Sequence, residues 1–465
     1  MLRITIIGGG PGGYTAAFAA AKRGASVTLI EAESLGGTCL NWGCIPTKTI
    51  KTSADAILLG KRFESLGLEQ PTNFSINMKT VVNRKDSVIN ILRSGLEKKC
   101  SALKIKLIAG KASLLNENTV EVKLNDNTNT KIESDFIIIA TGSRNLELKN
   151  FAFDQKNILS SDDMLNLESV PKRLCIVGGG VIGCEMAFIY AAFGSKVTII
   201  EAQDRLLPLA SVDLELSKLL QREAKKSGIN VIVKQSVQSY EQNENGLKVT
   251  IKAIDNDNTT ELESDTVLIS VGRIPQTQGL NLEQVGVSTD ERGWIKVNDY
   301  LESSIKNIYA IGDVLGPTKI MLAHVAAAEG LCVIKNIFGE TEKMDYSVVP
   351  SAIFTMPEIG TVGITEQEAK AKGLEVKTTS VLMRELGKAH ALGELPGLVK
   401  LVAETKTGRL LGANISGAYA TELIAELTLA LKMRASVKDI AQTIHAHPTL
   451  SEGIFEAALS LSEEI

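Results

Sequence analysis

The chain has 465 residues, and its 50 lysines and arginines nearly balance its 54 aspartates and glutamates, giving a formal net charge of −4. This length predicts about three domains. A hydrophobic content of 44% can fill their cores, which excludes a disordered or low-complexity chain. Charges of both signs are mixed along the chain and aromatic residues are sparse, which argues against nucleic-acid and membrane partners and favours small-molecule chemistry.

The first predicted element lies in residues 4–21, an uncharged run with the composition of a signal peptide or a membrane span. Its centre reads GGGPGG, which would break a helix of either kind, so a strand, a tight turn and a helix are predicted instead. The run also recurs, because residues 4–32 and 174–202 align without a gap and are identical at 14 of 29 positions. A targeting peptide has no reason to recur in mid-chain, so we expect no signal or transit peptide.

Each copy of the repeat reads as a strand, a glycine turn, an alanine-rich helix and a second strand, which predicts a βαβ unit. In the GxGxxG spacing, the first glycine permits the tight turn, the second admits a pyrophosphate, and the third packs the helix on the strand. The glycines could serve helix packing alone, but an acid ends each second strand, where a ribose diol needs an acceptor. These residues are Gly8, Gly10, Gly13 and Glu31 in the first unit, and Gly178, Gly180, Gly183 and Glu201 in the second. Two dinucleotides are therefore predicted, and Glu201 favours NAD over NADP because a carboxylate repels a 2′-phosphate.

The remaining elements follow in chain order. Residues 51–105 carry apolar side chains at helical spacing and are predicted to be helical, and short strands then lead to FIIIATGS at 136–143. A matching strand, TVLISVGR at 266–273, closes the second unit, and a helix is predicted to begin near Met321. From residue 346 onwards strands alternate with amphipathic helices and the glycine motif is missing, which predicts a separate C-terminal domain.

Two cysteines, Cys39 and Cys44, lie in GGTCLNWGCIPTK directly after the first unit. On a regular helix their Cα atoms would be roughly 8.5 Å apart, beyond the reach of a disulfide, so the backbone is expected to turn at Gly43 and Pro46. The pair is either a redox disulfide or half of a metal site, and the metal reading lacks nearby cysteine or histidine ligands. Lys48 follows one turn later and can favour a thiolate. The isolated cysteines are expected to be small core residues; they are Cys100, Cys175, Cys184 and Cys332.

These motifs make the sequence similar to the flavin-dependent disulfide oxidoreductases, and within them most similar to the dihydrolipoamide dehydrogenases. The resemblance covers nearly the whole chain, and the order and spacing of the motifs make coincidence negligible. It rests on GGGPGG with Glu31, GGTCLNWGCIPTK at 36–48, ATGS at 140–143, GGGVIGCE at 178–185, VGRIP at 271–275, AIGD at 310–313, MLAH at 321–324 and HAHPTLSE at 445–452.

The resemblance implies an α/β fold with two Rossmann-like FAD- and NAD-binding domains and a C-terminal α+β dimerisation domain. The implied boundaries are 1–147 and 274–345 for the two parts of the FAD-binding domain, 148–273 for the NAD-binding domain, and 346–465 for the dimerisation domain. The implied FAD-binding residues are Gly8, Gly10, Gly13, Glu31, Thr38, Lys48, Gly110, Thr141, Gly142, Ser143, Asp313 and Ala323. The implied NAD-binding residues are Gly178, Gly180, Ile182, Gly183, Glu185, Glu201 and Gly272. The resemblance also implies that Lys48 pairs with Glu185 beside the flavin. The alternative is that Glu185 is a solvated acid in the first turn of a helix, where acids are common.

The chain has four histidines, and two of them lie in HAHPTLSE. Glu452 follows His447 by five residues and could hold the imidazole tautomer. By resemblance, His447 is the catalytic acid and base and Glu452 orients it. His445 is expected to be a packing or hydrogen-bonding residue, His324 to serve structure near the flavin, and His390 has no motif around it.

The implied reaction is oxidation of dihydrolipoamide on the lipoyl domains of acyltransferase or glycine-cleavage partners, with NAD⁺ as electron acceptor. The resemblance assigns thiol–disulfide interchange to Cys39 and flavin contact to Cys44, and it makes the enzyme a homodimer because His447 acts on the partner's site. A cytoplasmic location is expected. Glutathione reductase-like enzymes remain an alternative, although they use NADPH, and so do mercuric reductase-like enzymes, although this chain ends LSLSEEI without their C-terminal cysteine pair.

Overall fold

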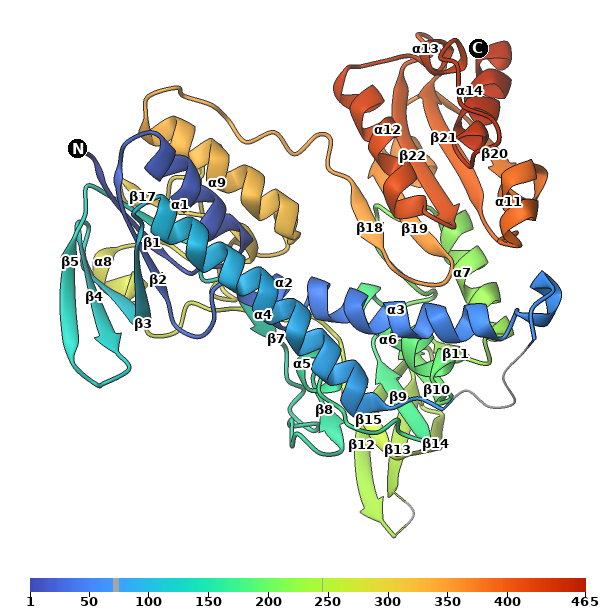
Figure 1. Ribbon diagram of the computed structural model, residues 1–465, viewed down its shortest axis with the longest axis horizontal. Coiled ribbons are helices and arrows are strands. Elements are labelled where there is room, and N and C mark those ends of the chain that lie inside the picture. Colours follow the sequence, from blue (N-terminus) through green and yellow to red (C-terminus); the bar gives the residue numbers. More distant parts are fainter. Residues whose placement is uncertain (70–74, 245) are drawn as a thin grey trace.

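The computed structural model describes residues 1–69, 75–244 and 246–465. The first βαβ unit is the centre of a seven-stranded sheet with the order β17-β6-β1-β2-β3-β4-β5 (Figure 1). Five of its strands are parallel: β1 (Arg3–Ile7), β2 (Ser26–Glu31), β3 (Lys106–Asn116), β6 (Phe136–Ile139) and β17 (Ile308–Ala310). The antiparallel strands β4 (Thr119–Leu124) and β5 (Asn129–Glu133) extend one edge.

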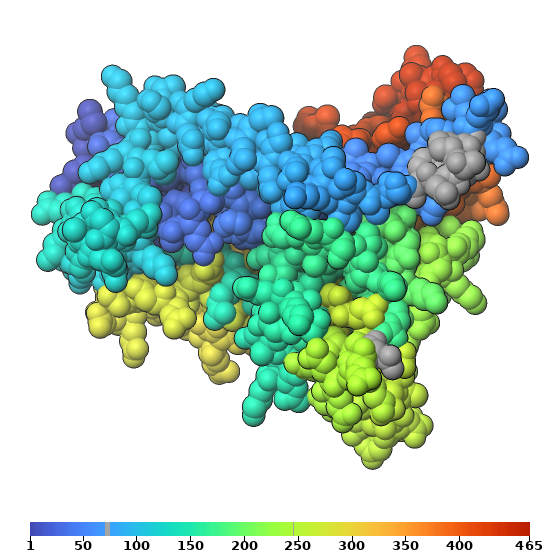
Figure 2. Space-filling view, turned by 60° about the horizontal axis from the view of Figure 1, so that its bottom comes forward, coloured from blue at the N-terminus to red at the C-terminus, as the bar shows by residue number. Residues whose placement is uncertain are grey.

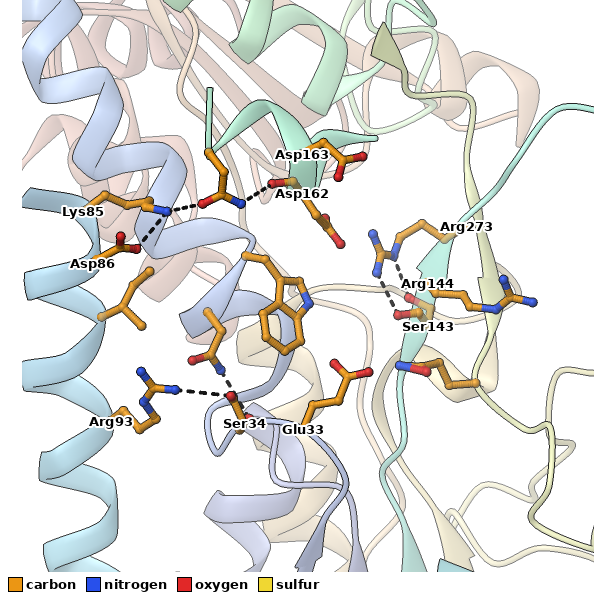
Figure 3. Close-up of a pocket in the computed structure, with 15 residues that line it drawn as sticks. Glu33, Ser34, Lys85, Asp86, Arg93, Ser143, Arg144, Asp162, Asp163 and Arg273 are labelled. Carbon is orange, nitrogen blue, oxygen red and sulfur yellow. Dashed lines mark hydrogen bonds and ion pairs between the residues drawn. The ribbon is translucent and has the colours of Figure 1, made fainter. Parts of the chain in front are cut away.

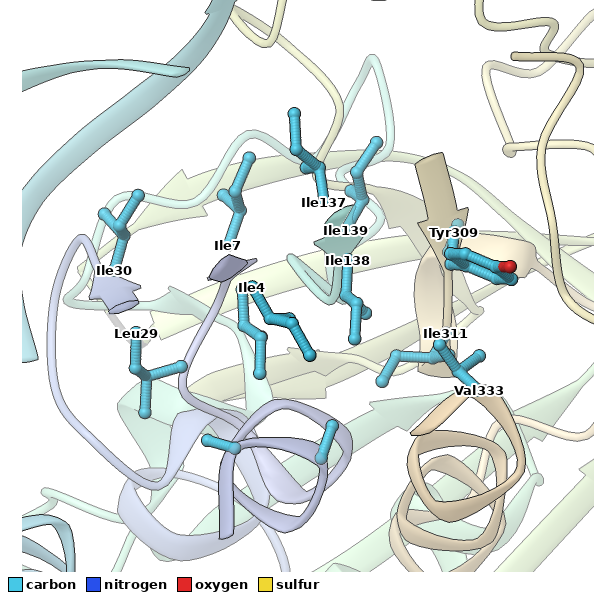
Figure 4. Packing of buried hydrophobic residues seen from close by; sticks show 14 of the residues in the cluster. Ile4, Ile7, Leu29, Ile30, Ile137, Ile138, Ile139, Tyr309, Ile311 and Val333 are labelled. Atoms are coloured by element: carbon cyan, nitrogen blue, oxygen red, sulfur yellow. The ribbon is translucent and has the colours of Figure 1, made fainter. Parts of the chain in front are cut away.

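The parallel strands are buried on both faces, which explains their nearly continuous apolar sequence. Because side chains alternate along a strand, Ile137 and Ile139 point to one face while Ile138 points to the other, where Val333 lies (Figure 4). The two helices α1 (Pro11–Lys22) and α9 (Ala323–Ile337) pack tightly against each other. A Cβ on Gly330 would lie 2.8 Å from the Gly12 carbonyl oxygen, so this approach needs glycine.

The second βαβ unit repeats the first, with α6 (Val181–Ala192) between two parallel strands. Its sheet has the order β11-β10-β9-β15-β8. The strands are β8 (Ile158–Leu159), β9 (Arg173–Val177), β10 (Lys196–Glu201), β11 (Asn230–Val233) and β15 (Thr266–Ile269). An antiparallel sheet of β12 (Gln235–Asn243), β13 (Gly246–Ala253) and β14 (Thr259–Ser264) stands out from the body (Figure 2). The repeat predicted from sequence is therefore confirmed as two βαβ units.

The stretch predicted to be helical at 51–105 is formed mainly by two α-helices. α3 (Cys44–Gly60) begins seven residues earlier, and α4 (Met78–Ala102) packs against it. Between them come a short 3-10 helix, η1 (Glu64–Leu66), and Gly67, whose φ of +77° ends the helical path; residues 70–74 of the predicted stretch lie outside the described residues. Short helices elsewhere are α5 (Ser161–Met164), α8 (Leu282–Val285) and η2 (Gly312–Leu315).

The C-terminal domain is an antiparallel sheet with the order β18-β19-β22-β21-β20, covered by α12 on β19 and β22 and by α14 on β20 and β21. The strands are β18 (Ser351–Ile353), β19 (Glu358–Gly363), β20 (Val376–Leu382), β21 (Leu398–Glu404) and β22 (Leu410–Gly417). The helices are α10 (Glu366–Ala371), η3 (Met383–Glu385), α11 (Gly387–Leu392), α12 (Ala420–Lys432), α13 (Val437–Ala441) and α14 (Glu452–Glu464). The predicted fold, two Rossmann-like units followed by an α+β domain, is confirmed. In the described part of the chain, none of the helices combines the length and the apolar character that a bilayer crossing needs.

A buried lysine joins the second unit to the C-terminal domain. Lys400 on β21, whose side chain is only 7% exposed, contacts Asp213 at 3.1 Å and Glu366 at 2.8 Å. Asp213 is itself fully buried and caps α7 (Leu214–Lys226) by accepting a hydrogen bond from the Glu215 amide. The neighbouring lysine cations hold the pKa of Glu366 down at about 2, first through the hydrogen bond from Lys370 and then through that from Lys400. The ion pair of Lys400 with Asp213 therefore fixes the second unit against the C-terminal domain.

Replacing Lys400 by methionine is expected to destabilise the protein by about 3 kcal/mol, because it leaves the buried Asp213 carboxylate without its cation. The measurement is the shift of the urea unfolding midpoint. Lys343→Met is the matched control, since Lys343 pairs with Asp299 at 2.9 Å but its side chain is 63% exposed, and surface pairs contribute about 0–1 kcal/mol. Equal shifts for the two variants would contradict the role given to Lys400.

Candidate active site

The two glycine turns have the same geometry. Gly8 and Gly178 have φ values of +108° and +106°, in the left-handed region that favours glycine. A Cβ on Gly13 would overlap the Gly8 carbonyl oxygen, so the first turn of α1 packs directly on β1. By contrast, a Cβ on Gly10 would meet nothing nearer than the Gly37 Cα at 3.9 Å. Gly10 therefore leaves open space before a helix N-terminus without a side-chain cap, where unpaired N–H groups can bind phosphate.

The acids at the ends of the second strands also match. Glu31 accepts hydrogen bonds from the amides of Gly9 at 2.7 Å and Glu33 at 2.8 Å. Glu201 accepts the equivalent bonds from Gly179 at 2.5 Å and Gln203 at 2.7 Å. Burial raises the pKa of Glu31, and the amide hydrogen bonds oppose that shift. Each carboxylate is held beside its glycine turn, where a ribose on the pyrophosphate would meet it.

Four further predicted FAD residues, Thr141, Ser143, Asp313 and Ala323, lie near the edge of the first sheet where β1, β6 and β17 end. The Ser143 hydroxyl donates to Asp313 at 2.7 Å. The Thr141 hydroxyl is buried and has no hydrogen-bond partner among the described residues, so it is a polar group that the protein itself does not satisfy. The helix predicted near Met321 begins at Ala323, two residues later. The carboxyl edge of a parallel sheet is where such folds bind dinucleotides.

Arg273 ties the two units together and was not among the predicted residues. Its guanidinium donates to the Ser143 hydroxyl at 2.6 Å, to the Ser143 carbonyl at 2.8 Å and to Asn145 at 2.9 Å. It is positioned by β16 (Arg273–Pro275), which pairs with β7 (Ser143–Asn145). Arg273 therefore orients Ser143, which in turn holds Asp313. Arg273 is the last residue of the VGR motif, but its partner lies 130 residues away in the chain, so no local pattern indicates the contact.

Beside Arg273 and Ser143 lies a cavity of about 510 Å³ between α2 (Gly37–Asn41), α4, α5 and the β7–β16 pair (Figure 3). Its charged lining is balanced and so does not select an anion: the cations are Lys85, Arg93, Arg144 and Arg273, and the carboxylates are Glu33, Asp86, Asp162 and Asp163.

Cys39 and Cys44 lie on two helices that meet at Gly43. Cys39 is in α2 and Cys44 begins α3, and a Cβ on Gly43 would lie 2.8 Å from the Thr38 carbonyl oxygen. The expected turn is thus present. The Cys39 thiol donates a hydrogen bond to the Cys44 sulfur, which together with the Lys48 cation lowers the pKa of Cys44 to about 7. The same hydrogen bond, with burial, raises the pKa of Cys39. The Cys39 hydrogen bond, the Lys48 cation and the position of Cys44 at the start of α3 all favour a thiolate on Cys44 in the reduced pair.

Lys48 and Glu185 form the pair that the resemblance implies. The Lys48 ammonium donates to both Glu185 oxygens, at 3.0 and 2.8 Å, and lies 4.4 Å from the centre of the Phe354 ring. Glu185 is only 4% exposed, which excludes the solvated helix acid, and it also accepts from the Phe354 amide at 2.9 Å. This pair joins the cysteine helix α3, the helix α6 of the second unit and the C-terminal domain at one point.

His447 and Glu452 form a second polar pair on the C-terminal domain. His447 Nδ1 lies 2.7 Å from Glu452 Oε1, and the Thr449 amide donates to Glu452 Oε2 at 2.9 Å. A carboxylate only accepts, so Nδ1 carries the hydrogen and Nε2 has a free lone pair. The His447 hydrogen bond, followed by that of Thr449, lowers the pKa of Glu452. The His447 side chain is 78% exposed, so Nε2 can take a proton from an incoming group.

Comparison with known proteins decides the family. Residues 2–330 match the pyridine nucleotide-disulphide oxidoreductase family, and residues 349–458 match the dimerisation domain of the same family. The chain belongs to this family.

Relatives in this family match over almost the whole chain. The dihydrolipoyl dehydrogenase of Haloferax volcanii is 38% identical over 98% of this chain and 95% of its own length. That of Geobacillus stearothermophilus is 39% identical over 97% and 94%. Among solved structures, LpdA from Mycobacterium tuberculosis has a TM-score of 0.92 at 28% identity, covering 99% and 100% of the two chains. The flavoprotein disulfide reductase RclA from Escherichia coli has a TM-score of 0.86 at 27% identity, covering 98% and 99%.

Enzymes of the pyridine nucleotide-disulphide oxidoreductase family use FAD and NAD, and the two turns fit one dinucleotide each. The cofactors of this chain are FAD and NAD. Packing also requires glycine at position 110, because a Cβ there would lie 2.6 Å from the Lys123 carbonyl oxygen of β4. The second-unit residue Ile182 lies at the start of α6, and Gly272 lies between the carboxyl end of β15 and the start of β16.

The remaining cysteines and histidines take structural positions. All four isolated cysteines are buried free thiols, as expected, and burial raises the pKa of Cys175 to about 12. His324 contacts the Pro350 carbonyl oxygen at 2.9 Å and His390 the Arg384 carbonyl oxygen at 2.8 Å.

Gly10→Ala and Gly13→Ala are expected to fail in different ways. The Cβ at position 13 forces α1 away from β1 and lowers the free energy of unfolding by about 1–3 kcal/mol. The Cβ at position 10 fills open space only, so stability changes by less than about 1 kcal/mol while FAD affinity falls. Urea unfolding of the FAD-free chain and a fluorescence titration with FAD separate the two. Normal FAD affinity in Gly10→Ala would mean that this space does not receive the pyrophosphate.

Lys48→Met is expected to raise the pKa of Cys44 above about 7, because one of the two groups that favour the thiolate is lost. The readout is the rate of alkylation of the reduced protein by iodoacetamide against pH, whose midpoint should move upwards. Lys51→Met is the control on the same helix, since Lys51 pairs with Asp55 at 2.9 Å rather than with the cysteine pair. If the midpoint of the alkylation curve did not move, Lys48 would not be one of the groups that lower the pKa of Cys44.

Proposed function

We propose that this protein is an FAD-containing, NAD-dependent dihydrolipoyl dehydrogenase, which oxidises dihydrolipoamide to lipoamide through Cys39 and Cys44. The observation that carries the proposal is the position of the cysteine pair, in which the pKa of one thiol is lowered. The pair follows the glycine turn of the first unit, and Lys48 on the same helix as Cys44 is paired with Glu185 on α6 of the second unit. A chain with two dinucleotide turns and a dithiol between them has the parts for electron transfer from thiols to a nicotinamide.

We assign the residues of the two cofactor sites as the motifs imply. FAD would contact the first glycine turn, Glu31 at the ribose, Thr38, Lys48, Gly110, the Thr141–Ser143 segment, Asp313 at the ribityl chain and Ala323 at the start of α9. NAD would contact the second glycine turn, Ile182, Glu185, Glu201 at the ribose and Gly272. The domain boundaries proposed from sequence accompany this assignment: 1–147 with 274–345, 148–273, and 346–465.

The chain's own residues supply the thiol chemistry. His447 Nε2 takes the proton of one substrate thiol, and the resulting thiolate attacks Cys39 Sγ of the oxidised pair, so that the Cys39–Cys44 bond breaks and Cys44 leaves as a thiolate. The second substrate thiol then attacks the substrate sulfur of the mixed disulfide, so that the bond to Cys39 Sγ breaks and the thiol proton passes to Cys39; this step releases lipoamide and leaves Cys39 as a thiol. Lys48 and the Cys39 thiol hold the Cys44 thiolate. FAD, when bound, accepts the two electrons of the dithiol and delivers them as hydride to NAD⁺.

The active unit in this proposal is a homodimer in which His447 serves the partner's cysteine pair. The match to the family's dimerisation domain supports it. So does an exposed apolar set at the C-terminal domain, which a monomer would leave in water: Tyr419, Leu429, Met433 and Ile444. We further propose that the substrate is carried on lipoyl domains of acyltransferase or glycine-cleavage proteins, and that the enzyme works in the cytoplasm.

The test is a pair of assays on the FAD-loaded protein: NAD⁺ reduction by dihydrolipoamide, and NADPH-driven reduction of glutathione disulfide. We expect activity in the first assay and none in the second, because Glu201 stands where the 2′-phosphate of NADPH would bind. Activity in the second assay alone would replace the proposal by a glutathione reductase-like function, and mercuric ion reduction by NADPH would indicate the mercuric reductase-like alternative.

A further inference from the structure

A second histidine–carboxylate pair lies two residues before the first. His445 Nε2 is 2.8 Å from Glu426 Oε1 on α12, and His445 Nδ1 is 2.9 Å from the Thr443 carbonyl oxygen. The ring also packs against Phe455 of α14, with 5.8 Å between ring centres. His445 therefore contacts both helices that cover the sheet of the C-terminal domain.

The hydrogen bonds fix the charge of this ring. A carbonyl oxygen and a carboxylate oxygen both accept hydrogen bonds and donate none, so both ring nitrogens of His445 must carry hydrogen. The ring is then an imidazolium paired with the Glu426 carboxylate, and its hydrogen bonds are charge-assisted and strong. Its side chain is only 6% exposed, and a buried charge is stable only when it is paired and fully hydrogen-bonded, as it is here.

His445 and Leu450 are the buried points of a segment that is largely exposed between them. Between the end of α13 at Ala441 and the start of α14 at Glu452, Ile444 is 97% exposed and the His447 side chain 78% exposed. Below His445, the Thr449 hydroxyl donates to the Ala446 carbonyl oxygen at 2.7 Å, so the turn that carries His447 is fixed from both sides. Loss of the His445 contacts would release the N-terminal side of the turn that carries His447, while the Thr449 and Glu452 hydrogen bonds still hold its C-terminal side.

We propose that His445 is a positioning residue, held as a buried imidazolium by Glu426, which fixes the segment that presents His447 to the substrate thiol. This inference rests on the proposed function of His447 as the base. A displacement of about 1 Å between base and thiol can cost about 100-fold in rate. Since FAD and NAD contact other parts of the chain, the effect falls on the thiol half of the reaction alone.

The kinetic test compares His445→Gln and Glu426→Gln with His390→Gln, whose ring contacts only the exposed Arg384 carbonyl oxygen. On the FAD-loaded protein, we expect dihydrolipoamide-dependent kcat to fall about 10- to 100-fold in the first two variants, while NADH oxidation by ferricyanide, which needs no thiol deprotonation, stays within about two-fold. The double variant should lose no more than the worse single variant, because both remove one interaction. Unchanged dihydrolipoamide turnover, or an equal fall in both activities, would overturn the proposal.

A second measurement is independent of the substrate. The chain has only four histidines, so ¹⁵N spectra of histidine-labelled protein, assigned with the variants above, report each ring separately. We expect the His445 ring at pH 7.5 to show two protonated nitrogens, and this signal to vanish in Glu426→Gln. A neutral His445 ring would overturn the proposal. If the unmodified protein does not oxidise dihydrolipoamide at all, the proposed function fails, and this spectrum still decides the state of His445.

Discussion

Serine at Cys39 or at Cys44 is expected to lower dihydrolipoamide-dependent NAD⁺ reduction by about 1,000-fold or more, because neither variant can form the disulfide that accepts the substrate's electrons. Oxidation of NADH by ferricyanide should continue in both, since it uses the two dinucleotide sites without the thiols. The two variants should differ in alkylation. Cys39→Ser keeps the Cys44 thiol beside Lys48 and should still react with iodoacetamide near neutral pH, whereas Cys44→Ser leaves only Cys39, whose pKa is still raised by burial.

The matched control for the cysteine variants is Cys332→Ser. Cys332 is buried on α9, and its thiol donates to the Glu342 carbonyl oxygen at 3.3 Å, a bond that a serine hydroxyl can replace. We expect this variant to keep full dihydrolipoamide turnover. Substantial turnover in Cys39→Ser or Cys44→Ser, or a loss of the ferricyanide reaction as large as that of turnover, would contradict the role of the pair as the redox disulfide.

The features that sequence predicted well are local ones. In each βαβ unit, the glycine turn and the acid lie within about 30 residues of each other in the chain. The spacing of glycine and apolar residues dictates the backbone conformation over that distance. Gly13 illustrates this, because its Cβ would overlap an oxygen only five positions earlier. The start of α9 was placed within two residues for the same reason.

The features that sequence did not show depend on contacts between distant segments. Arg273 belongs to a recognisable motif, but its function becomes visible only when β16 pairs with β7 and brings it to Ser143. Gly110 shows the opposite case. The resemblance implies that it contacts FAD, and only the structure shows that the adjacent strand β4 also requires a glycine there. Motifs identify positions, and packing decides which interaction each position serves.

The charge of His445 could not be predicted from sequence, because it depends on a contact with a distant residue. In sequence His445 is one of two histidines in HAHPTLSE, and packing or hydrogen bonding was the natural expectation. The hydrogen bonds do exist, but Glu426 lies 19 residues earlier on α12, with α13 in between. Only that contact indicates a charged ring and connects the residue to the presentation of His447.

His447→Gln is expected to lower dihydrolipoamide-dependent kcat by about 100- to 10,000-fold, the usual contribution of a general base. Glutamine keeps the size of the side chain and can still donate to Glu452, but it has no nitrogen lone pair to accept the thiol proton. Glu452→Gln should cost less, because the imidazole remains while its tautomer is no longer fixed. His390→Gln is the control, and NADH oxidation by ferricyanide should be unchanged in all three. Full turnover in His447→Gln would assign the base to another residue.

The same variants can show on which subunit His447 acts. If its target is the partner's cysteine pair, a dimer of one Cys39→Ser chain and one His447→Gln chain contains one intact site, made from the cysteines of the second chain and the histidine of the first. Each parent homodimer contains none. Random mixing makes about half of the dimers mixed, so refolding the two inactive proteins together should restore about a quarter of the normal kcat. If His447 acts within its own chain, every site in the mixture lacks one essential group, and mixing restores nothing.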